Sequence, residues 1–174
     1  MADKTLFQRD YVFYGDYARK VNDLTDIIDK DSGAKIFDFT IELFITAAIV
    51  GCHYGKRSKP QKSGDKKSSI MAGQFSTHSD ELKFAFKLVL LTADRNNVDA
   101  VDRLNRTFKN PNTDENYTLF EEYMLGGIDI LHDTFKVDSN HSYLDYLDSL
   151  RDLISEFNQV GDSTTEIPTT AFFD

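Results

Sequence analysis

Six basic side chains lie within one short stretch of this chain, and the chemistry open to them is the recognition of phosphate. The stretch from His53 to Ser69 holds six basic residues and one acidic residue, a net +5 in a chain of net charge -9, so the rest carries -14. Lysine and arginine release counterions when they bind a polyanion, and nearby glycine and serine let backbone N–H groups approach phosphates. The sequence therefore predicts a nucleic-acid-binding site, with Tyr54 as the base-stacking residue, formed by Tyr54, Lys56, Arg57, Lys59, Lys62, Lys66 and Lys67.

The same stretch has two other interpretations. A charged, flexible loop also keeps a protein in solution, and it can bind an acidic protein surface instead of a nucleic acid. Such a surface in a neighbouring copy would consist of Asp145, Asp148, Asp152, Glu156, Asp162 and Glu166. A nucleotide-binding P-loop is rejected, because Gly51 and Gly55 are separated by three residues and Arg57 follows Lys56 where serine or threonine is required.

Two further pairs of residues are candidates for catalysis. His132-Asp133 resembles the dyad of helical metal-dependent phosphohydrolases, with His53 or His78 as an upstream ligand, but the intervals are loose and a histidine near a helix end has a simpler electrostatic role. Cys52 and His53 are adjacent, a spacing that rarely gives nucleophile–base geometry. We therefore predict no catalytic residue, no metal site and no cofactor.

Composition limits the class of protein. A chain of 174 residues with 40% hydrophobic residues suits one globular domain with a substantial core. The single cysteine excludes an internal disulfide. The longest apolar run, from Leu43 to Val50, is too short to span a bilayer, and the N-terminal residues lack the order of a signal peptide. We expect a soluble, cytoplasmic protein with no membrane contact.

Hydrophobic periodicity predicts an all-α fold, a compact bundle of about five or six helices with one long basic loop over residues 53–75. Residues 1–160 would form a single helical domain and residues 161–174 a polar C-terminal tail. The helices are expected within residues 14–29, 40–53, 76–94, 96–110, 114–135 and 139–160.

Several residues carry packing predictions. Gly126-Gly127 inside a long helix favours a close approach of another backbone, or a kink. Ser79 is expected as an N-cap, and a calcium loop at Asp29 is rejected because its glycine comes too early. Two apolar stripes are expected on helix faces, the first as core and the second as core or a partner-binding seam: Val98, Val101, Leu104 and Phe108, then Leu147, Leu150, Ile154 and Phe157.

Two stretches together resemble a known family. They are FTIELFITAAIVGCHYGKR, from Phe39 to Arg57, and LFEEYMLGGIDILHD, from Leu119 to Asp133. Both resemble the small proteins called DNA-phosphorothioation-associated, or dnd-associated, protein four. The resemblance implies an accessory protein of bacterial gene clusters that modify DNA or restrict unmodified DNA, as in phage defence, with no assigned enzymatic activity. The lysine-rich insertion after Arg57 and the aromatic acidic tail depart from the family pattern.

The sequence thus supports a non-enzymatic accessory protein that contacts DNA through the basic loop while its helical faces dock a larger enzyme or ATPase. The alternative is a protein-interaction or oligomerisation module whose basic loop binds an acidic surface and whose last helix pairs with another helix, in a second copy of the chain or a different protein. A metal-dependent phosphohydrolase built on His132 and Asp133 is a third hypothesis.

Overall fold

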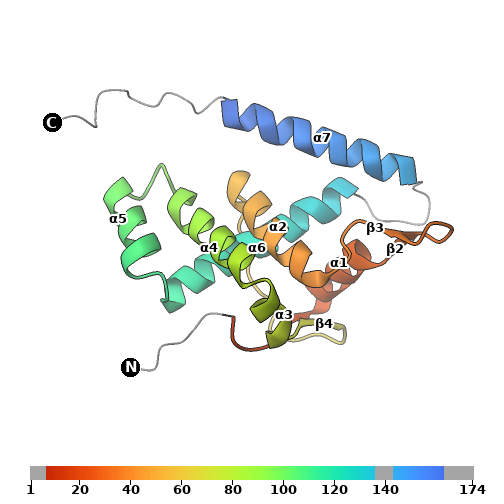
Figure 1. Cartoon of the computed structure of the whole chain (residues 1–174), viewed down its shortest axis with the longest axis horizontal. Coiled ribbons are helices and arrows are strands. Elements are labelled where there is room, and N and C mark those ends of the chain that lie inside the picture. The colour runs from red at the N-terminus through yellow and green to blue at the C-terminus, as the bar shows by residue number, and fades with distance from the viewer. Residues whose placement is uncertain (1–6, 136–142, 163–174) are drawn as a thin grey trace.

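The structure, a computed structural model, describes residues 7–135 and 143–162, with side chains described in the last segment for residues 144–159 only. The expected tail over 161–174 lies outside the described residues from residue 163 onward. The chain is mainly helical (Figure 1), and its elements in order are β1 (Tyr11–Tyr14), α1 (Gly15–Thr25), β2 (Ile27–Asp29), β3 (Ala34–Lys35), α2 (Thr40–His53), β4 (Lys67–Ile70), α3 (Ala72–Thr77), α4 (Ser79–Thr92), α5 (Ala100–Leu104), the π-helical turn η1 (Asn105–Lys109), α6 (Asp114–Phe135) and α7 (Tyr143–Asp162).

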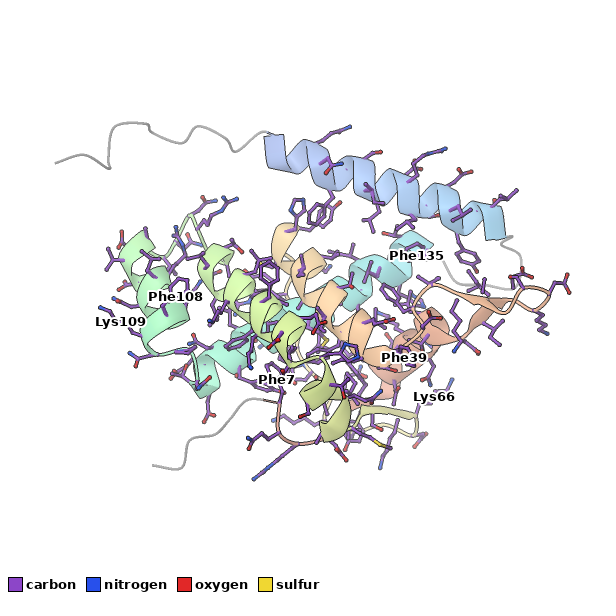
Figure 2. The ribbon with its side chains drawn as sticks, viewed as in Figure 1. Phe7, Phe39, Lys66, Phe108, Lys109 and Phe135 are labelled. Atoms are coloured by element: carbon purple, nitrogen blue, oxygen red, sulfur yellow. The ribbon has the colours of Figure 1, made fainter. Side chains whose placement is uncertain are left out.

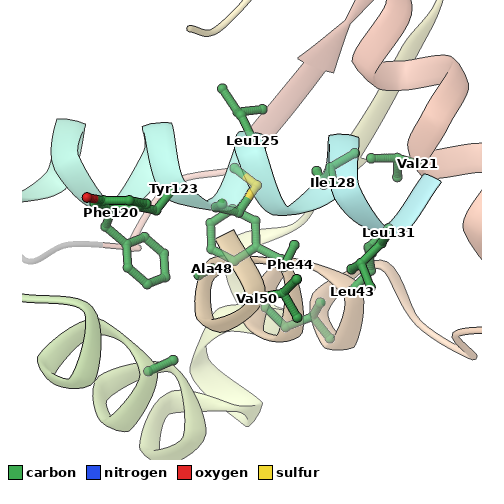
Figure 3. Close-up of a cluster of buried hydrophobic side chains, with 14 of the residues drawn as sticks. Val21, Leu43, Phe44, Ala48, Val50, Phe120, Tyr123, Leu125, Ile128 and Leu131 are labelled. Carbon is green, nitrogen blue, oxygen red and sulfur yellow. The ribbon is translucent and has the colours of Figure 1, made fainter. Parts of the chain in front are cut away.

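The core is built on two helices, α2 and α6, which cross at the centre of the molecule. Both have the bounds that the apolar pattern predicts, 40–53 and 114–135. Figure 3 shows the side chains of α2, among them Phe44 and Val50, facing those of α6, among them Phe120 and Ile128. Because α2 is apolar on almost every side, it is covered by α1, α4 and α6 together.

Three glycines set the distance between these two helices. A β-carbon on Gly127 would overlap the carbonyl oxygen of Ala47 and lie 2.5 Å from its carbonyl carbon. A β-carbon on Gly51 would likewise lie 2.7 Å from the backbone nitrogen of Gly127, and one on Gly126 would lie 2.6 Å from the carbonyl carbon of Lys56. The predicted close approach at Gly126-Gly127 is therefore confirmed, and its partner is α2 together with the chain that leaves it.

An aromatic cluster closes the core below the crossing. The ring of Phe7 lies 5.5 Å from that of Phe75 and 5.6 Å from that of Phe120, and it also contacts Phe44, Phe86 and Tyr117. Phe7 adopts a φ of 68°, a left-handed conformation that costs a bulky residue about 1–2 kcal/mol. Packing of the half-buried ring among five others offsets this cost, so Phe7 packs on the core although the residues between it and β1 are exposed.

The expected long loop over 53–75 is wrong in its second half. Residues Lys67–Ile70 form β4, which pairs antiparallel with β1 in the register Tyr11↔Ile70 and Tyr14↔Lys67. Ala72–Thr77 then form α3. A second small sheet pairs β2 with β3, and Asp29 at the end of β2 accepts hydrogen bonds through its carboxylate from Asp31 N and Ser32 Oγ in the turn.

The first apolar stripe is not core. The predicted helix over 96–110 exists as α5 and η1, but Val101 is 60% exposed, Leu104 48% and Phe108 60%. The reason is that the opposite face, which carries Arg103, is the one turned toward α4, where Arg103 donates a hydrogen bond to Leu91 O. Figure 2 shows Phe108 and Lys109 at the outer end of the molecule, far from Lys66. Ser79, expected as an N-cap, is instead the first residue of α4, and His78 is its N-cap.

Arg103 is a structural residue, and its truncation is expected to destabilise the fold. Its guanidinium donates to the carbonyl oxygens of Leu91 (3.0 Å), Arg95 (3.3 Å) and Val98, which lie at and beyond the C-terminal end of α4. Arg103→Ala leaves these carbonyls without that donor, and we expect a loss of about 2 kcal/mol in the free energy of unfolding. Urea denaturation measures it. The exposed Arg95→Ala is the control, and an equal effect of both substitutions would contradict the assignment.

The last helix, α7, runs along one edge of the bundle and packs against α6 (Figure 1). Of the stripe expected there, Leu147, Leu150 and Ile154 are 42%, 41% and 53% exposed, while Phe157 stacks on His53 at 3.7 Å between ring centroids. None of the helices in the described part of the chain has both the length and the apolar character needed to cross a membrane.

Candidate nucleic-acid interface

The basic residues lie on an extended segment that is fixed to the body along its length. We call residues 56–66 the basic strap. The N–H of Lys56 donates to Gly51 O (2.9 Å) at the end of α2, and Ser58 N donates to Glu122 O (2.9 Å) on α6. Further along, the side-chain oxygen of Gln61 accepts from Asp16 N (2.8 Å). The strap therefore passes from α6 to the start of α1 with a defined backbone path.

The far end of the strap is held by a contact between two glycines. Gly15 N donates to Lys66 O at 3.1 Å, and Gly15 has a φ of 59°. A β-carbon on Gly64 would lie 2.5 Å from Gly15 N and 2.6 Å from its α-carbon, so only glycine permits this approach. From there the chain enters β4 directly. The flexible-loop interpretation of this stretch does not match these contacts.

The ammonium groups of four strap lysines are free to bind an anion. Their side chains are exposed, and within the described ranges none of them forms an ion pair: Lys56, Lys59, Lys62 and Lys66. Lys67, the first residue of β4, is also exposed and lies over the ring of Tyr14 at 5.6 Å. Because neighbouring positive charges repel, a surface that displays four unpaired ammonium groups gains free energy when an anion covers it.

Arg57 differs from the lysines around it. Its Nε and Nη2 donate to Glu122 Oε2 at 2.8 and 2.5 Å, and its guanidinium lies over the ring of Tyr123 at 5.5 Å. A third contact reaches Asp94 at 3.8 Å. Its guanidinium is thus already engaged within the body, and it ties the strap to α6. Its predicted contact with nucleic acid stays a prediction, in competition with this internal ion pair.

Tyr54, the predicted stacking residue, is at the end of α2 under α7. Its ring meets that of His53 edge to face at 5.1 Å, and its hydroxyl oxygen is buried without a hydrogen bond among the described atoms. Burial first, and the nearby Glu156 carboxylate second, raise the pKa of Tyr54. The hydroxyl end of the ring therefore points away from solvent, and base stacking by Tyr54 stays a prediction.

The acidic groups beneath the strap are already satisfied. Asp129 accepts from Lys20 Nζ (2.7 Å), Ser58 Oγ (2.7 Å) and Tyr17 OH (3.1 Å). Glu122 is paired with Arg57, as described above. Asp129 and Glu122 are engaged in this way and form no ion pair with the strap lysines, while Lys62 is close enough to Glu121 of α6 to lower the pKa of that carboxyl.

Glu121 is a half-buried carboxylate on the same helix, and it accepts a hydrogen bond from Tyr11 OH at 2.8 Å. Burial is the main reason that its pKa is raised, and Glu122 adds to the effect. Since the folded-state pKa exceeds the unfolded one, ionisation of Glu121 lowers stability as pH rises through the range between these two values. At lower pH the carboxyl is neutral and this cost disappears.

We expect Glu121→Gln to be more stable than the wild type at pH 7 and to lose this advantage by pH 4. The amide oxygen of glutamine can still accept from Tyr11, while the buried charge is gone. Guanidinium denaturation from pH 4 to pH 8 measures the difference. Glu115→Gln, at an exposed position of the same helix, is the control and should show no such trend. An unchanged difference across the pH range would contradict the prediction.

The other catalytic candidates do not converge. His132 Nε2 lies 3.1 Å from Asp23 Oδ2 and 3.5 Å from Arg19 Nη1, in a charged network between α6 and α1. Of its two proposed upstream partners, His53 is stacked on Phe157 and His78 is the N-cap of α4. In residues 7–135 and 143–162, no group of three or more metal-binding side chains comes together.

Cys52 and His53 do not form a catalytic pair either. Cys52 Sγ lies 3.4 Å from Thr92 Oγ1, and burial raises the pKa of its thiol, which disfavours the reactive thiolate. A polar cavity of about 690 Å³ opens beside these residues, between the ends of α2 and α4, and Asp94 and Arg95 contribute to its lining. Sequence periodicity gave no sign of this cavity, because the loop after α4 forms one wall.

Comparison with known proteins agrees with the motifs in α2 and α6. No curated protein and no solved structure matches the chain. One family model does, that of the DNA sulphur modification system-associated protein 4, and it covers residues 16–167. The matched range runs from α1 through α7 and so includes the α2–α6 crossing and the basic strap. The resemblance inferred from the two motifs is confirmed: the chain belongs to the DNA sulphur modification system-associated protein 4 family.

Proposed function

We propose that this chain is a non-enzymatic accessory protein of a DNA sulphur modification system that holds DNA by its phosphates through the basic strap. Its family describes a protein associated with such a system, whose substrate is DNA. The observation that carries the proposal is the set of four unpaired lysines on a segment fixed at both ends. The role requires the bacterial cytoplasm, where DNA lies, and serves phage defence by restriction of unmodified DNA.

The expected binding is weak, salt-sensitive and tolerant of sequence, because phosphate contacts position a protein without reading bases. A fixed strap has one advantage over a flexible loop: its backbone is already ordered, so binding does not pay that entropy. The larger enzyme or ATPase of the system would dock on the other exposed surfaces, among them the apolar patch of α5 and η1.

Fluorescence anisotropy with a labelled duplex tests the proposal. The variant changes Lys56, Lys59, Lys62 and Lys66 to Gln, and a control with the same loss of charge changes the exposed Lys30, Lys35, Lys83 and Lys109 to Gln. We expect the strap variant to lose binding and the control to retain it. Equal binding by both variants, or no binding by the wild type at low salt, would overturn the proposal.

A second candidate function is a protein-interaction module whose strap binds an acidic protein surface. The observation that favours it is the amount of exposed apolar surface on two helical faces: Val101, Leu104 and Phe108 on α5 and η1, and Leu144, Leu147 and Ile154 on α7. In that case the strap variant would lose a protein partner from the same system while duplex DNA leaves the wild-type anisotropy unchanged.

A further inference from the structure

The two-stranded sheet at the far end of the strap has an inner and an outer face. Side chains alternate along β1, so Tyr11 and Phe13 share one face, and both rings pack against that of Phe44, at 5.4 and 6.4 Å. Tyr14, the next residue, therefore lies on the opposite face. Because residues opposite each other on antiparallel strands point the same way, Lys67, which pairs with Tyr14, shares this outer face.

Tyr14 is an aromatic residue outside the aromatic core. Among the described residues, no other ring packs against it and its hydroxyl forms no hydrogen bond, whereas Tyr11 donates its hydroxyl to Glu121. The ammonium group of Lys67 lies over the half-buried ring of Tyr14, with Nζ 5.6 Å from the ring centroid. A surface ring beside an exposed ammonium group is complementary to a nucleotide, which joins an aromatic base to a phosphate.

The junction between strap and sheet places this pair at the end of the row of lysines. Gly15, directly after Tyr14, donates its N–H to Lys66 O and lies against Gly64. Lys66 and Lys67 are consecutive, so the basic segment continues into the outer face of the sheet without a gap. Backbone contacts therefore fix the ring of Tyr14 next to the strap lysines, where a strand bound along the strap would reach it.

The carboxylates around this junction leave it positively charged. Asp16 is engaged by two cations of its own helix, at 2.7 and 3.1 Å, and Asp10 accepts a hydrogen bond from the first residue of α3. Asp65 is exposed, but the three lysines within three positions of it leave a local net charge of +2. This end of the strap therefore attracts a phosphate as the rest of the strap does.

We propose that Tyr14 stacks an unpaired base of single-stranded DNA, while Lys66 and Lys67 bind the phosphates next to that base. The inference rests on the proposed function, because the strap lysines bring the strand to the ring. In a duplex each base is paired and stacked on its neighbours, so a side chain fixed on a sheet does not reach its face. A single strand can turn a base onto the ring, and such stacking tolerates any sequence. Single-stranded DNA thus gains an interaction that duplex DNA lacks.

Two other aromatic residues are competitors for this role. Tyr54, at the opposite end of the strap, has its hydroxyl end buried under α7. Phe108 is 60% exposed, and Nζ of Lys87 lies 5.9 Å from its ring centroid, a pairing much like that of Tyr14. It lies far from Lys66, however (Figure 2). Phe108 is therefore the matched control, because it has the ring and the ammonium group without the strap.

Fluorescence anisotropy with a labelled single strand of thymidines, and with a labelled duplex, tests the inference. Tyr14→Leu keeps an apolar side chain on β1 but has no aromatic face. We expect it to bind the single strand about 10-fold more weakly, the value of one stacked base, and to bind the duplex as the wild type does. Tyr14→Phe and Phe108→Leu should both match the wild type on the single strand.

The outcomes separate this inference from the proposed function. If the wild type binds DNA and Tyr14→Leu binds the single strand equally well, or loses affinity for both forms of DNA alike, Tyr14 does not stack a base and the strap remains the DNA contact. If the wild type binds neither form at low salt, both proposals fail.

Photo-crosslinking identifies the stacked residue directly. A single strand with iodouracil in place of one thymine, irradiated in complex with the wild type, forms a covalent bond to an aromatic side chain stacked on that base. Mass spectrometry of the digested complex should locate this bond at Tyr14. A bond at Tyr54 or at another residue, with none at Tyr14, rules out the assignment. A loss of affinity caused only by altered folding does not produce the expected crosslink.

Discussion

Replacing Gly127 by alanine is expected to destabilise the protein by about 3 kcal/mol or more, an unusually large effect for a single methyl group. The new β-carbon would overlap the carbonyl oxygen of Ala47, which belongs to the backbone of α2 and has no rotamer to change. The two central helices must therefore separate, and the side chains that they bury against each other, Phe44 and Ile128 among them, lose contacts. The higher intrinsic helix propensity of alanine, about 1 kcal/mol, does not compensate.

Thermal denaturation followed by circular dichroism measures this effect, with an expected fall in Tm of about 6–12 °C. Gly73→Ala is the matched control. Gly73 lies in α3, where a β-carbon would meet no atom within 4 Å, so the same substitution should stabilise the protein slightly there. A Gly127→Ala variant as stable as the wild type would mean that α2 and α6 do not cross as closely as described.

The second large effect concerns the salt dependence of DNA binding. If Lys56, Lys59, Lys62 and Lys66 each neutralise one phosphate, the slope of log affinity against log salt is steeper by about 3.6 in the wild type than in the four-glutamine variant. Wild-type affinity should then fall about 150-fold between 50 and 200 mM salt through these four contacts alone. Anisotropy titrations at four salt concentrations give both slopes.

The control with Lys30, Lys35, Lys83 and Lys109 changed to glutamine has the same net charge as the strap variant. It should keep the wild-type slope, because a slope reports local contacts and not the overall charge of the protein. If both variants flatten the slope equally, the DNA is held by diffuse attraction, and the strap is not a specific clamp.

Local sequence patterns predicted the helices of this protein well, for physical reasons that the structure makes clear. Residues Thr40–His53 and Asp114–Phe135 have the predicted bounds because a long apolar or amphipathic run has few other ways to satisfy its backbone. The glycine pair Gly126-Gly127 was also informative. A helix tolerates the low helix propensity of two glycines where another backbone must come close to it.

Sequence patterns were less successful at predicting contacts between residues that lie far apart in the chain. Tyr11 pairs with Ile70 in the small sheet, and Phe7 fills a space between four elements, and neither relation leaves a periodic signal. The stripe at Val101 and Phe108 was wrongly assigned to the core because periodicity shows that a helix has an apolar face but not what that face meets. The candidate site follows the same rule: its lysines were predicted, but the pairing of Arg57 with Glu122 was not.

The contact between Gly126 and Lys56 joins the DNA-binding candidate to the folding core. The strap begins where the chain leaves α2, and the carbonyl group of Lys56 rests directly on α6. The position of the first lysine is thus fixed by the same backbone contact that sets the spacing of the two central helices. By thermodynamic linkage, a polyanion that binds the strap in this geometry also stabilises the close contact between α2 and α6. Binding should therefore slow the hydrogen exchange of buried backbone amides in these two helices. Conversely, a substitution that opens the crossing would weaken binding without removing any charge.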